Sequence, residues 1–337
     1  MRIAIFGAGA VGLSLAAYWL SQGHQAVIVS LSGRGRARFS DRPVLKGSGC
    51  VSGQWQIEFL DPHTALEGAE LAVIAQQVEG HLAAVDALDA HLGNGQCVLV
   101  SGALAFATSL LAERLKGRGI DVPIGATPVP PVNARMTGPC EVLVSRIKET
   151  LEVFSAGPHA QGLRRVLQPL LPATALSSLT PLAGADLNNI NPIAHYANAL
   201  CNFTRMEKGE SWLTYAGYTE HAGKLIDALD AERQAIAASI GVETRSTYSY
   251  FAEWNGMSGG TVPEISKTIV ERGLSPLGPA SLSTRYVLED VPYGLVPLEA
   301  LGRRQGVRTP LISAGIDIFS ALYGVDFRRK PTMTPLP

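Results

Sequence analysis

Short apolar runs alternate with amphipathic stretches through the first part of the chain. Ile3–Phe6 and Ala26–Val29 are uninterrupted apolar runs, and Val11–Gln22 between them carries leucine and alanine at helical spacing. These segments predict a strand, a helix and a second strand, which together form a βαβ unit. Fully apolar strands are typical of a parallel sheet that is covered by helices on both faces.

The same alternation continues toward residue 180. Further strands are predicted at Trp55–Leu60, Leu71–Ala75, Cys97–Val100 and Val142–Arg146. Helices are predicted over residues 80–92, 107–116 and 161–171. Strands that alternate with helices imply an α/β fold with a doubly wound, Rossmann-type parallel sheet, which binds its ligand at the carboxyl ends of the strands.

Helices dominate the pattern beyond Pro181. In Lys224–Ile240, isoleucine and leucine recur at helical spacing until Gly241 ends the helix. Thr309–Tyr323 predicts a last amphipathic helix, and the residues from Arg328 onward are expected to form a frayed tail. We therefore expect a dinucleotide-binding domain over residues 1–180 and an all-α C-terminal substrate domain over residues 181–337.

Composition excludes some classes of function. The 337 residues suffice for two domains, and 28 Lys and Arg against 29 Asp and Glu give no field that would attract nucleic acid or an anionic membrane. The longest apolar run, Cys97–Ala107, is shorter than the roughly 18 residues of a membrane helix. The first strand follows Met1 directly, which leaves no room for a signal peptide. Four scattered cysteines without metal-ligand spacing predict reduced thiols, no metal site and a cytoplasmic protein.

The sequence Gly7-Ala8-Gly9-Ala10-Val11-Gly12 fits the dinucleotide-binding pattern G-x-G-x-x-G. It follows a predicted strand and opens a predicted helix, as the motif requires. Gly7 permits a tight turn, Gly9 lets backbone N–H groups approach a pyrophosphate, and Gly12 lets helix and strand pack closely. The expected cofactor contacts are Gly7, Gly9, Ala10, Val11 and Gly12. A glycine turn without a ligand remains the alternative.

The end of the second strand bears on which cofactor binds. NAD-binding domains usually place an acid there for the ribose 2′-hydroxyl, whereas this chain has Ser30. Ser30 and Ser32 can donate hydrogen bonds to a 2′-phosphate, and Arg34 can pair with it. This predicts NADP(H) in preference to NAD(H), and the alternative is a solvated basic loop.

A dehydrogenase needs a proton donor or acceptor near the nicotinamide, and histidine is the side chain whose pKa lies closest to neutral pH. Among the seven histidines, His195 is distinctive because it follows an asparagine-rich stretch ending in Pro192 and begins an apolar helix. A structural role for His195, such as capping, remains open from the residues alone.

Arg285 and Asp290 lie just before Pro292 and Gly294 and suggest a buried charge pair. Together with His195 they suggest a carboxylate clamp beside a proton-transfer pair, provided that both segments face the same cofactor. A purely structural ion pair that closes a helix end is the alternative. Asn191 is a candidate for substrate binding, although its position favours capping of the following helix.

The second half resembles the octopine/nopaline (opine) dehydrogenase family from Asn189 to Pro310. The matching segments are Asn189–His195, Leu200–Glu207, Asp230–Arg233, Gly278–Leu295 and Gly306–Pro310. The run Arg285–Gly294 is the most specific of them, whereas the N-terminal half matches only as any dinucleotide domain does. One departure is Tyr196, because many relatives have proline directly after this histidine.

That resemblance implies a reductive condensation. The amine of an amino acid adds to a 2-oxo acid of the pyruvate or 2-oxoglutarate type, water leaves, and NAD(P)H delivers hydride to the imine. On that template His195 is the general acid/base, Asp290 orients it and favours the imidazolium, and Arg285 holds a substrate carboxylate. The sequence names neither substrate, and the apolar helical domain allows a homodimer.

Two other functions remain open. One is a ketopantoate-reductase-like, NADPH-dependent reductase of a 2-oxo acid. Such enzymes rely on a lysine near a helix start, and Lys208 comes only after the His195 helix should have ended. The other is a catalytically idle NADP(H)-binding sensor, for which the intact His195, Arg285 and Asp290 give no support.

Overall fold

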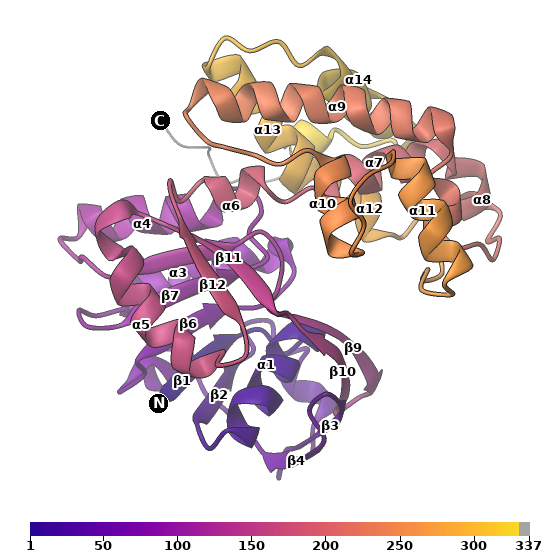
Figure 1. Ribbon diagram of the computed structural model, residues 1–337. Coiled ribbons are helices and arrows are strands. Elements are labelled where there is room, and N and C mark those ends of the chain that lie inside the picture. Colours follow the sequence, from indigo (N-terminus) through magenta and orange to yellow (C-terminus); the bar gives the residue numbers. More distant parts are fainter. Residues whose placement is uncertain (330–337) are drawn as a thin grey trace. The chain divides into compact units, whose positions relative to one another are not determined.

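The computed structural model describes residues 1–329, which form two compact units: Met1–Asp186 and the residues from Leu187 onward (Figure 1). The sequence analysis placed the division at residue 180, a few residues earlier. Within the described residues, no helix has the length and apolar character that crossing a membrane requires.

The first unit is built on an eight-stranded sheet in the order β12-β11-β8-β7-β6-β1-β2-β5. Its strands pair in parallel, except that β8 and β11 pair antiparallel. The strands are β1 Arg2–Phe6, β2 Gln25–Val29, β5 Glu58–Phe59, β6 Leu71–Ile74, β7 Cys97–Ser101, β8 Ile124–Thr127, β11 Thr150–Ser155 and β12 Ala175–Leu179. Strands β6, β7 and β8 are buried along their whole length. The predicted Rossmann-type sheet is confirmed.

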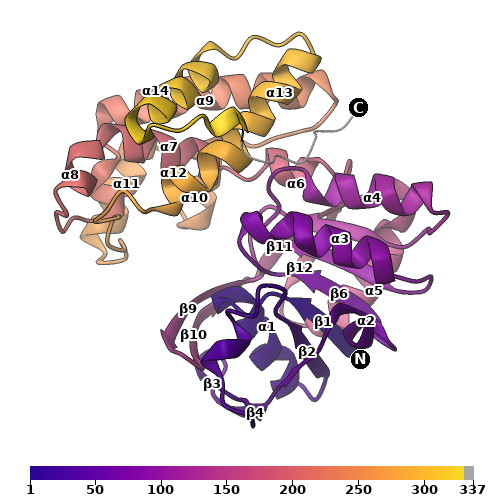
Figure 2. The same ribbon diagram turned by 180° about the vertical axis from the view of Figure 1, so that it is seen from behind.

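Helices cover both faces of this sheet, which explains the uninterrupted apolar strands. Figure 2 shows α3 and α4 on one face, and Figure 1 shows α5 on the other. The helices of this unit are α1 Ala10–Ser21, α2 Pro62–Leu66, α3 His81–His91, α4 Ala107–Gly117 and α5 Ala160–Leu170. The bounds of α1, α3, α4 and α5 lie close to the predicted ones, whereas α2 was not predicted.

A second, four-stranded sheet packs on the first unit's α1. Its order is β4-β3-β10-β9, with β3 Val44–Gly49, β4 Gly53–Gln56, β9 Val132–Gly138 and β10 Glu141–Ile147. Helix α1 contacts all four of these strands as well as β1 and β2 of the large sheet, so residues 12–19 are buried on every side. The predicted strand Val142–Arg146 is observed as β10 and belongs to this second sheet. The sequence analysis did not predict the sheet itself, because strands such as β3 carry lysine, glycine and serine instead of a regular apolar alternation.

The predicted single strand Trp55–Leu60 is wrong. The chain forms β4 up to Gln56, antiparallel to β3, and then β5 at Glu58–Phe59, which pairs in parallel with β2. Ile57 between them is buried in the core, where the chain passes from one sheet to the other. The apolar pattern marked the burial correctly and did not reveal the change of sheet.

The second unit is built from helices, which confirms the predicted all-α domain. Its elements are α7 Asn191–Cys201, α8 Phe203–Glu207, η4 Thr214–Gly217, α9 Glu220–Ser239, α10 Thr247–Trp254, α11 Val262–Glu271, α12 Arg285–Leu288, the π-helical turn η5 Val291–Leu295, α13 Val296–Arg304 and α14 Pro310–Tyr323. Helix α9 is the longest, with 20 residues.

The predicted frayed tail is wrong for Arg328. Its guanidinium donates to both carboxylate oxygens of Glu299 at 2.7 Å and also pairs with Asp317, so it joins α13 to α14. The rest of the predicted tail, residues 330–337, lies outside the described residues.

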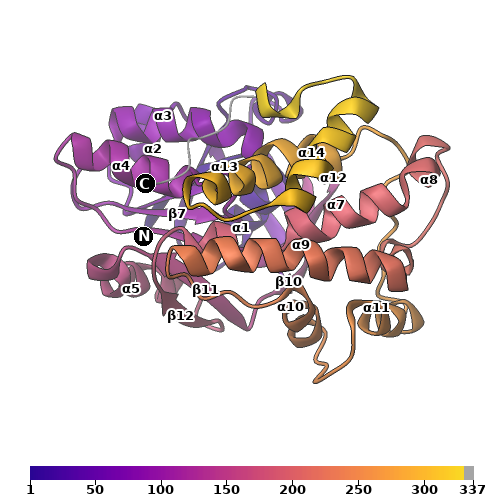
Figure 3. The same cartoon turned by 90° about the horizontal axis from the view of Figure 1, so that it is seen from above.

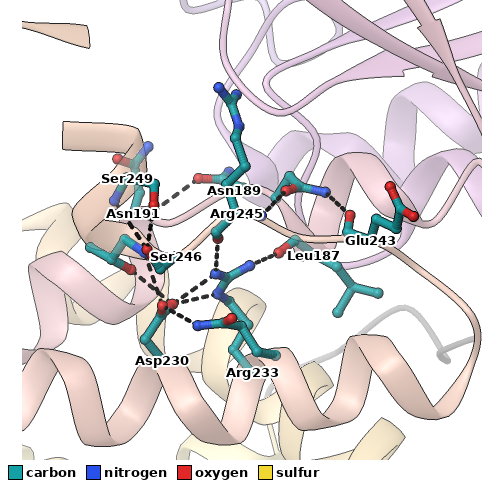
Figure 4. Close-up of polar contacts among 12 residues, drawn as sticks. Leu187, Asn189, Asn191, Asp230, Arg233, Glu243, Arg245, Ser246 and Ser249 are labelled. Carbon is teal, nitrogen blue, oxygen red and sulfur yellow. Dashed lines mark hydrogen bonds and ion pairs between the residues drawn. The ribbon is translucent and has the colours of Figure 1, made fainter. Parts of the chain in front are cut away.

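A buried ion pair fixes how the second unit begins (Figure 4). Arg233 is 0% exposed, donates from Nε to Asp230 at 2.8 Å, and also donates to the carbonyls of Leu187 and Arg245. Asp230 in turn accepts the backbone N–H of Thr247 at 2.9 Å. The pair therefore joins α9 to the segment that leads into α7 and to the start of α10. Removing one partner would leave an uncompensated buried charge, which is strongly destabilising.

Candidate active site

The turn between β1 and α1 has the shape that a dinucleotide needs. Gly7 has φ +135°, and a Cβ there would lie 2.3 Å from the carbonyl oxygen of Ala75. A Cβ at Gly12 would lie 2.0 Å from the carbonyl oxygen of Gly7. Gly9 differs, because a Cβ there would meet nothing within 4 Å. The turn therefore has no room for a side chain at Gly7 and Gly12, where strand and helix meet, whereas the space beside Gly9 is empty.

The N-terminus of α1 is available to an anion. Gly9 precedes the helix without a side-chain hydrogen bond to it, and the first turn, which starts at Ala10 and Val11, contains no acidic residue. Free N–H groups and the positive end of the helix dipole suit a phosphate at this place. The residues present thus fit the pyrophosphate of a dinucleotide.

The loop after β2 returns to this turn. Ser30 is half-buried, and its Oγ accepts the backbone N–H of Arg36 at 3.3 Å. A Cβ on Gly35 would lie 2.4 Å from the Cβ of Ala8, so the loop packs directly on the glycine turn. Ser32 and Arg34, the other two predicted cofactor residues in this loop, are exposed.

Arg38 is a candidate that the sequence analysis missed. Its guanidinium donates to the carbonyl of Ala8 within the glycine turn. Its Nε is buried and has no hydrogen-bond partner among residues 1–329. A cation with an unsatisfied donor beside the turn fits an anionic group. The sequence offered only a run of alternating arginines, in which nothing distinguishes Arg38 from Arg34.

His195 and Asp290 form a close pair in the second unit. Nδ1 of His195, on α7, lies 2.8 Å from Oδ2 of Asp290, which immediately precedes η5. The two side chains are 12% and 7% exposed. An ionised carboxylate only accepts, so Nδ1 carries the proton and Nε2 is left as an acceptor. Such an orienting partner is what a histidine needs to act as a base or an acid.

Helix α7 begins earlier than the sequence analysis expected. It starts at Asn191, so His195 lies within the helix and does not begin it. Tyr196, the departure from the family pattern, continues the helix and packs edge-on against Phe319 with ring centroids 5.3 Å apart. The helix that carries the histidine is therefore anchored at the next residue, through Tyr196.

Burial dominates the electrostatics of His195. Loss of solvation lowers its pKa from the ordinary value, the charge and hydrogen bond of Asp290 oppose this, and the cation of Arg285 adds to the lowering. Taken alone, the interaction with Asp290 favours the imidazolium, as expected. The net shift of the His195 pKa is nevertheless downward, because burial outweighs this interaction. The resting side chain is thus a neutral imidazole with its Nδ1–H directed at Asp290.

Tyr286 covers one face of this imidazole, a contact that no sequence pattern indicates. The two rings are parallel, with centroids 3.9 Å apart and an interplanar angle of 5°. Burial raises the pKa of Tyr286, while Thr214 and Arg285 oppose the rise. The tyrosine therefore stays a neutral phenol and limits the rotation of the His195 ring.

The predicted buried pair of Arg285 and Asp290 is wrong. Arg285 is exposed at the start of α12, and it forms no ion pair with any described residue. Asp290 pairs with His195, the partner that the family resemblance implied. The reason is that the chain turns from α12 into the π-helical η5 between the two residues, which sends the side chains in different directions. A guanidinium left free near the imidazole remains available to a substrate anion.

Asn191 does not cap α7 with its side chain. It is the first helical residue, and its own backbone N–H donates to Oδ1 of Asn189 at 3.1 Å. Asn191 is half-buried and lies in the region held by the Asp230–Arg233 pair (Figure 4). The capping role that the sequence favoured is therefore wrong for Asn191, since a different asparagine supplies the acceptor.

Lys208 does not occupy the position that a ketopantoate-reductase-like mechanism requires. It follows the short helix α8 and is exposed, whereas His195 lies on α7. In the middle of α7 the titratable side chain is His195, and its partner is the Asp290 carboxylate next to η5.

Comparisons with known proteins agree with this arrangement. Residues 179–323 match a family model described as NAD/NADP octopine/nopaline dehydrogenase, alpha-helical domain. The chain is 29% identical over 336 residues to an opine dehydrogenase of Arthrobacter sp. (strain 1C), covering 97% of this chain and 92% of that one. A solved octopine dehydrogenase with NADH and L-arginine has a TM-score of 0.75 at 16% identity, covering 96% and 89% of the two chains. Yersinopine dehydrogenase with NADP+ gives 0.74 at 15% identity, covering 96% and 93%.

The first unit has the sheet and the glycine turn of a dinucleotide-binding domain, and the second unit is helical. Residues 179–323 are similar to the octopine/nopaline (opine) dehydrogenase family, in the part of the chain where the residues from Asn189 to Pro310 indicated it. At 16% and 15% identity the solved structures establish the fold alone.

Proposed function

We propose that this protein is an NAD(P)H-dependent opine dehydrogenase that condenses the amine of an amino acid with a 2-oxo acid. The first unit binds the dinucleotide and the second unit binds the substrates. The observation that carries the proposal is the contact of 2.8 Å between His195 and Asp290, both nearly buried. Condensation releases water, so it needs a group that moves a proton, and an oriented imidazole is suited to that task.

His195 handles that proton at Nε2. Its pKa is lowered by burial, so the neutral ring accepts a proton from the ammonium group of the amino acid and frees the amine for attack on the oxo carbon. The same proton then returns to the hydroxyl that leaves as water. Asp290 holds the ring through Nδ1 and stabilises the transient imidazolium. The bound nicotinamide supplies the hydride that reduces the imine.

Arg285 binds a substrate carboxylate in this proposal. Both substrates carry a carboxylate, and the exposed Arg285 guanidinium has no ion partner among the described residues. A guanidinium can hold a carboxylate with two parallel hydrogen bonds, which fixes the orientation of the carbon that reacts. Asn191, half-buried at the start of the same helix as His195, is a second candidate for substrate contact.

We propose that the preferred cofactor is NADP(H). Ser30 stands where an acid would repel a 2′-phosphate, and the Arg38 guanidinium beside the glycine turn adds positive charge. Ser30→Asp should shift the kcat/KM ratio toward NADH, and Ser40→Asp, an exposed serine farther along the chain, serves as the matched control. An unchanged ratio in Ser30→Asp would refute the role of this position.

We also propose that the protein is a homodimer and acts in the cytoplasm. Its cysteines, Cys50, Cys97, Cys140 and Cys201, are all free thiols, which suits a reducing compartment.

The decisive experiment is a matrix of amino acids against 2-oxo acids, with NADPH oxidation followed by absorbance and the product identified by mass. Oxidation only in the presence of both substrates, with a product mass equal to their sum less water plus two hydrogens, is the expected result. Turnover with the oxo acid alone would establish a reductase instead. Tight NADPH binding without turnover in any pair would establish a sensor.

A further inference from the structure

The loop that follows β7 lies at the edge of the large sheet where a dinucleotide binds. Strand β1 has β2 on one side and β6, followed by β7, on the other. In the proposed complex the loop after β2 contacts the ribose of the adenosine half, and the glycine turn after β1 holds the pyrophosphate. The nicotinamide half of the cofactor is then directed to the other side of β1, toward the carboxyl ends of β6 and β7.

Residues 101–106, which we call the β7 loop, offer backbone and few side-chain atoms to a ligand. Gly102 is half-buried, whereas the other residues of the loop are buried. The N–H groups of Gly102 and Ala103 donate to the carbonyl of Thr127, the last residue of β8, at 3.1 and 2.8 Å. The first half of the loop is therefore tied to β8, and the backbone of Gly102 stays accessible.

The second half of the β7 loop is strained. Ala105 and Phe106 are consecutive residues with φ of +62° and +55°, and among residues 1–329 no other non-glycine residue has a positive φ. A side chain disfavours this left-handed conformation, so it persists only where the surroundings enforce it. Strain of this kind collects at active sites and at loops that hold ligands. A specific contact is therefore needed to hold the loop in this shape.

Asp186 supplies that contact from the short helix α6, Gly184–Leu187. Its Oδ1 accepts the backbone N–H of Phe106 at 2.7 Å. Asp186 is 7% exposed, and its Oδ2 is buried without a hydrogen-bond partner among residues 1–329. Burial raises the pKa of Asp186 to about 7, although the N–H groups of Phe106 and of Asp186 itself oppose the rise. A buried acid with an unsatisfied oxygen is unfavourable for folding alone, so its contact with a strained residue indicates a role in the loop.

The helix that follows the loop is anchored independently of Asp186. Phe106 directly precedes α4, and α4 packs along α3 (Figure 3). Figures 1 and 2 show α6 next to α4. Because α4 is held by α3, loss of the bond to Asp186 should displace the loop and leave the helix in place.

We infer that Asp186 is a positioning residue, which holds the β7 loop in the shape that receives the nicotinamide. Its side chain is buried, so it acts through the backbone of Ala105 and Phe106 and not by touching the cofactor. The inference rests on the proposed binding of a dinucleotide to the first unit. It does not depend on which substrates the second unit binds.

Two variants separate the hydrogen bond of Asp186 from the rest of its side chain. Asp186→Leu fills the site and removes the acceptor, so the left-handed residues lose their support and the loop relaxes. Asp186→Asn is the matched control, because its carboxamide oxygen still accepts the N–H of Phe106. Both are compared with the wild-type chain by calorimetric titration of NADPH and of 2′-phospho-ADP-ribose, which is NADPH without its nicotinamide. NADH and ADP-ribose form a second pair of ligands.

Asp186→Leu should affect the cofactor and spare the fragment. Its Kd for NADPH should be roughly tenfold weaker or more, the size of a lost hydrogen bond, while the Kd for the fragment stays within about twofold of the wild-type value. Asp186→Asn should keep both Kd values close to those of the wild type. An equal loss of both ligands in Asp186→Leu would overturn the inference, because the whole dinucleotide site would then be damaged. A loss of NADPH affinity in Asp186→Asn as large as that in Asp186→Leu would also overturn it.

Hydrogen exchange in the wild-type chain tests the loop without any substitution, even if Asp186→Leu does not fold. NADPH should slow exchange in the peptide that covers residues 101–107 more than the fragment does. The peptide of α5, on the other face of the sheet, is the internal control and should be unaffected by the choice of ligand. Equal protection of residues 101–107 by both ligands would overturn the inference, since the loop would then not meet the nicotinamide.

Failure of this inference and failure of the proposed function give different results. A wild-type chain that binds neither the cofactors nor their fragments would overturn the proposed dinucleotide site, and the inference with it. A wild-type chain that binds them, with an Asp186→Leu variant that binds them equally well, would overturn the role of Asp186 alone.

Discussion

The glycine turn and the His195–Asp290 pair are assembled in different ways. The turn is local: β1 and α1 supply it from consecutive residues, and it depends on side chains being absent at Gly7 and Gly12. The pair joins positions 95 residues apart, and it depends on side chains that are present and packed. The glycine turn is therefore sensitive to added side-chain atoms, and the His195–Asp290 pair is sensitive to their removal. The first should control cofactor affinity and the second turnover.

The largest effect is expected from removing the imidazole. His195→Ala should lower kcat by about 10²- to 10⁴-fold, because a positioned acid/base contributes that much to a proton-transfer step. The Kd for NADPH should stay unchanged, since the glycine turn is untouched. Initial rates with the active substrate pair and a fluorescence titration of NADPH measure the two quantities.

His221→Ala is the matched control for that variant. His221 is an exposed histidine on α9 and lies outside the site, so its removal should leave kcat and cofactor affinity unchanged. Full turnover in His195→Ala would show that the proton-transfer assignment is wrong.

Gly12→Ala is expected to have the opposite effect, a loss of NADPH affinity. The new methyl group would lie 2.0 Å from the carbonyl oxygen of Gly7, which is backbone and has to move. The moved turn loses N–H contacts to the pyrophosphate, and charged hydrogen bonds of this kind together amount to roughly a 10²-fold weaker NADPH Kd. Fluorescence titration measures it, and thermal unfolding without cofactor separates it from a loss of folding.

Gly9→Ala sharpens the same prediction. Nothing lies within 4 Å of a Cβ at Gly9, so the unliganded fold should tolerate the methyl group. Its effect should appear only in NADPH affinity and not in the melting temperature. Normal affinity in Gly9→Ala would contradict the close approach of the cofactor at this glycine.

The same contrast explains how far the sequence could predict the molecule. Local features were accessible: the helix predicted over 107–116 is observed at Ala107–Gly117, and the glycine motif lies between the strand and helix it requires. The small sheet was not predicted, because its polar strands are stabilised by contacts with α1. Such contacts leave no periodic pattern in the sequence. The predicted pair of Arg285 and Asp290 was wrong for a similar reason, since spacing along the chain does not give direction across a π-helical turn. The contact of Asp290 with His195, which the family resemblance implied, is observed.

Arg285 tests whether the second site also binds the substrate. Arg285→Gln should raise the KM of the oxo acid or the amino acid by roughly 10- to 100-fold, the size of a lost charged hydrogen bond, with NADPH affinity unchanged. Because the Arg285 cation lowers the pKa of His195, its loss should raise that pKa. Opine oxidation needs the neutral imidazole, so its acid limb in the pH–rate profile should move to higher pH.

Arg285→Lys separates these two effects. Lysine keeps the positive charge near His195 and lacks the two-pronged geometry of the guanidinium. The KM should therefore rise while the acid limb stays in place. A limb that moves equally in both variants would show that the charge of Arg285 does not act on the imidazole.

The smallest effect is expected from the ring that covers His195. Tyr286→Leu removes a parallel stack with centroids 3.9 Å apart, which is worth about 0.5–1.5 kcal/mol, or roughly a two- to tenfold lower kcat. Tyr286→Phe keeps the stack and should retain nearly full kcat. If both variants lose the same activity, the hydroxyl near Thr214 matters more than the ring. A lower melting temperature in Tyr286→Leu, with unchanged kcat and pH–rate profile, would show that Tyr286 contributes only to packing. The His195–Asp290 pair would then be positioned by α7 and η5 alone.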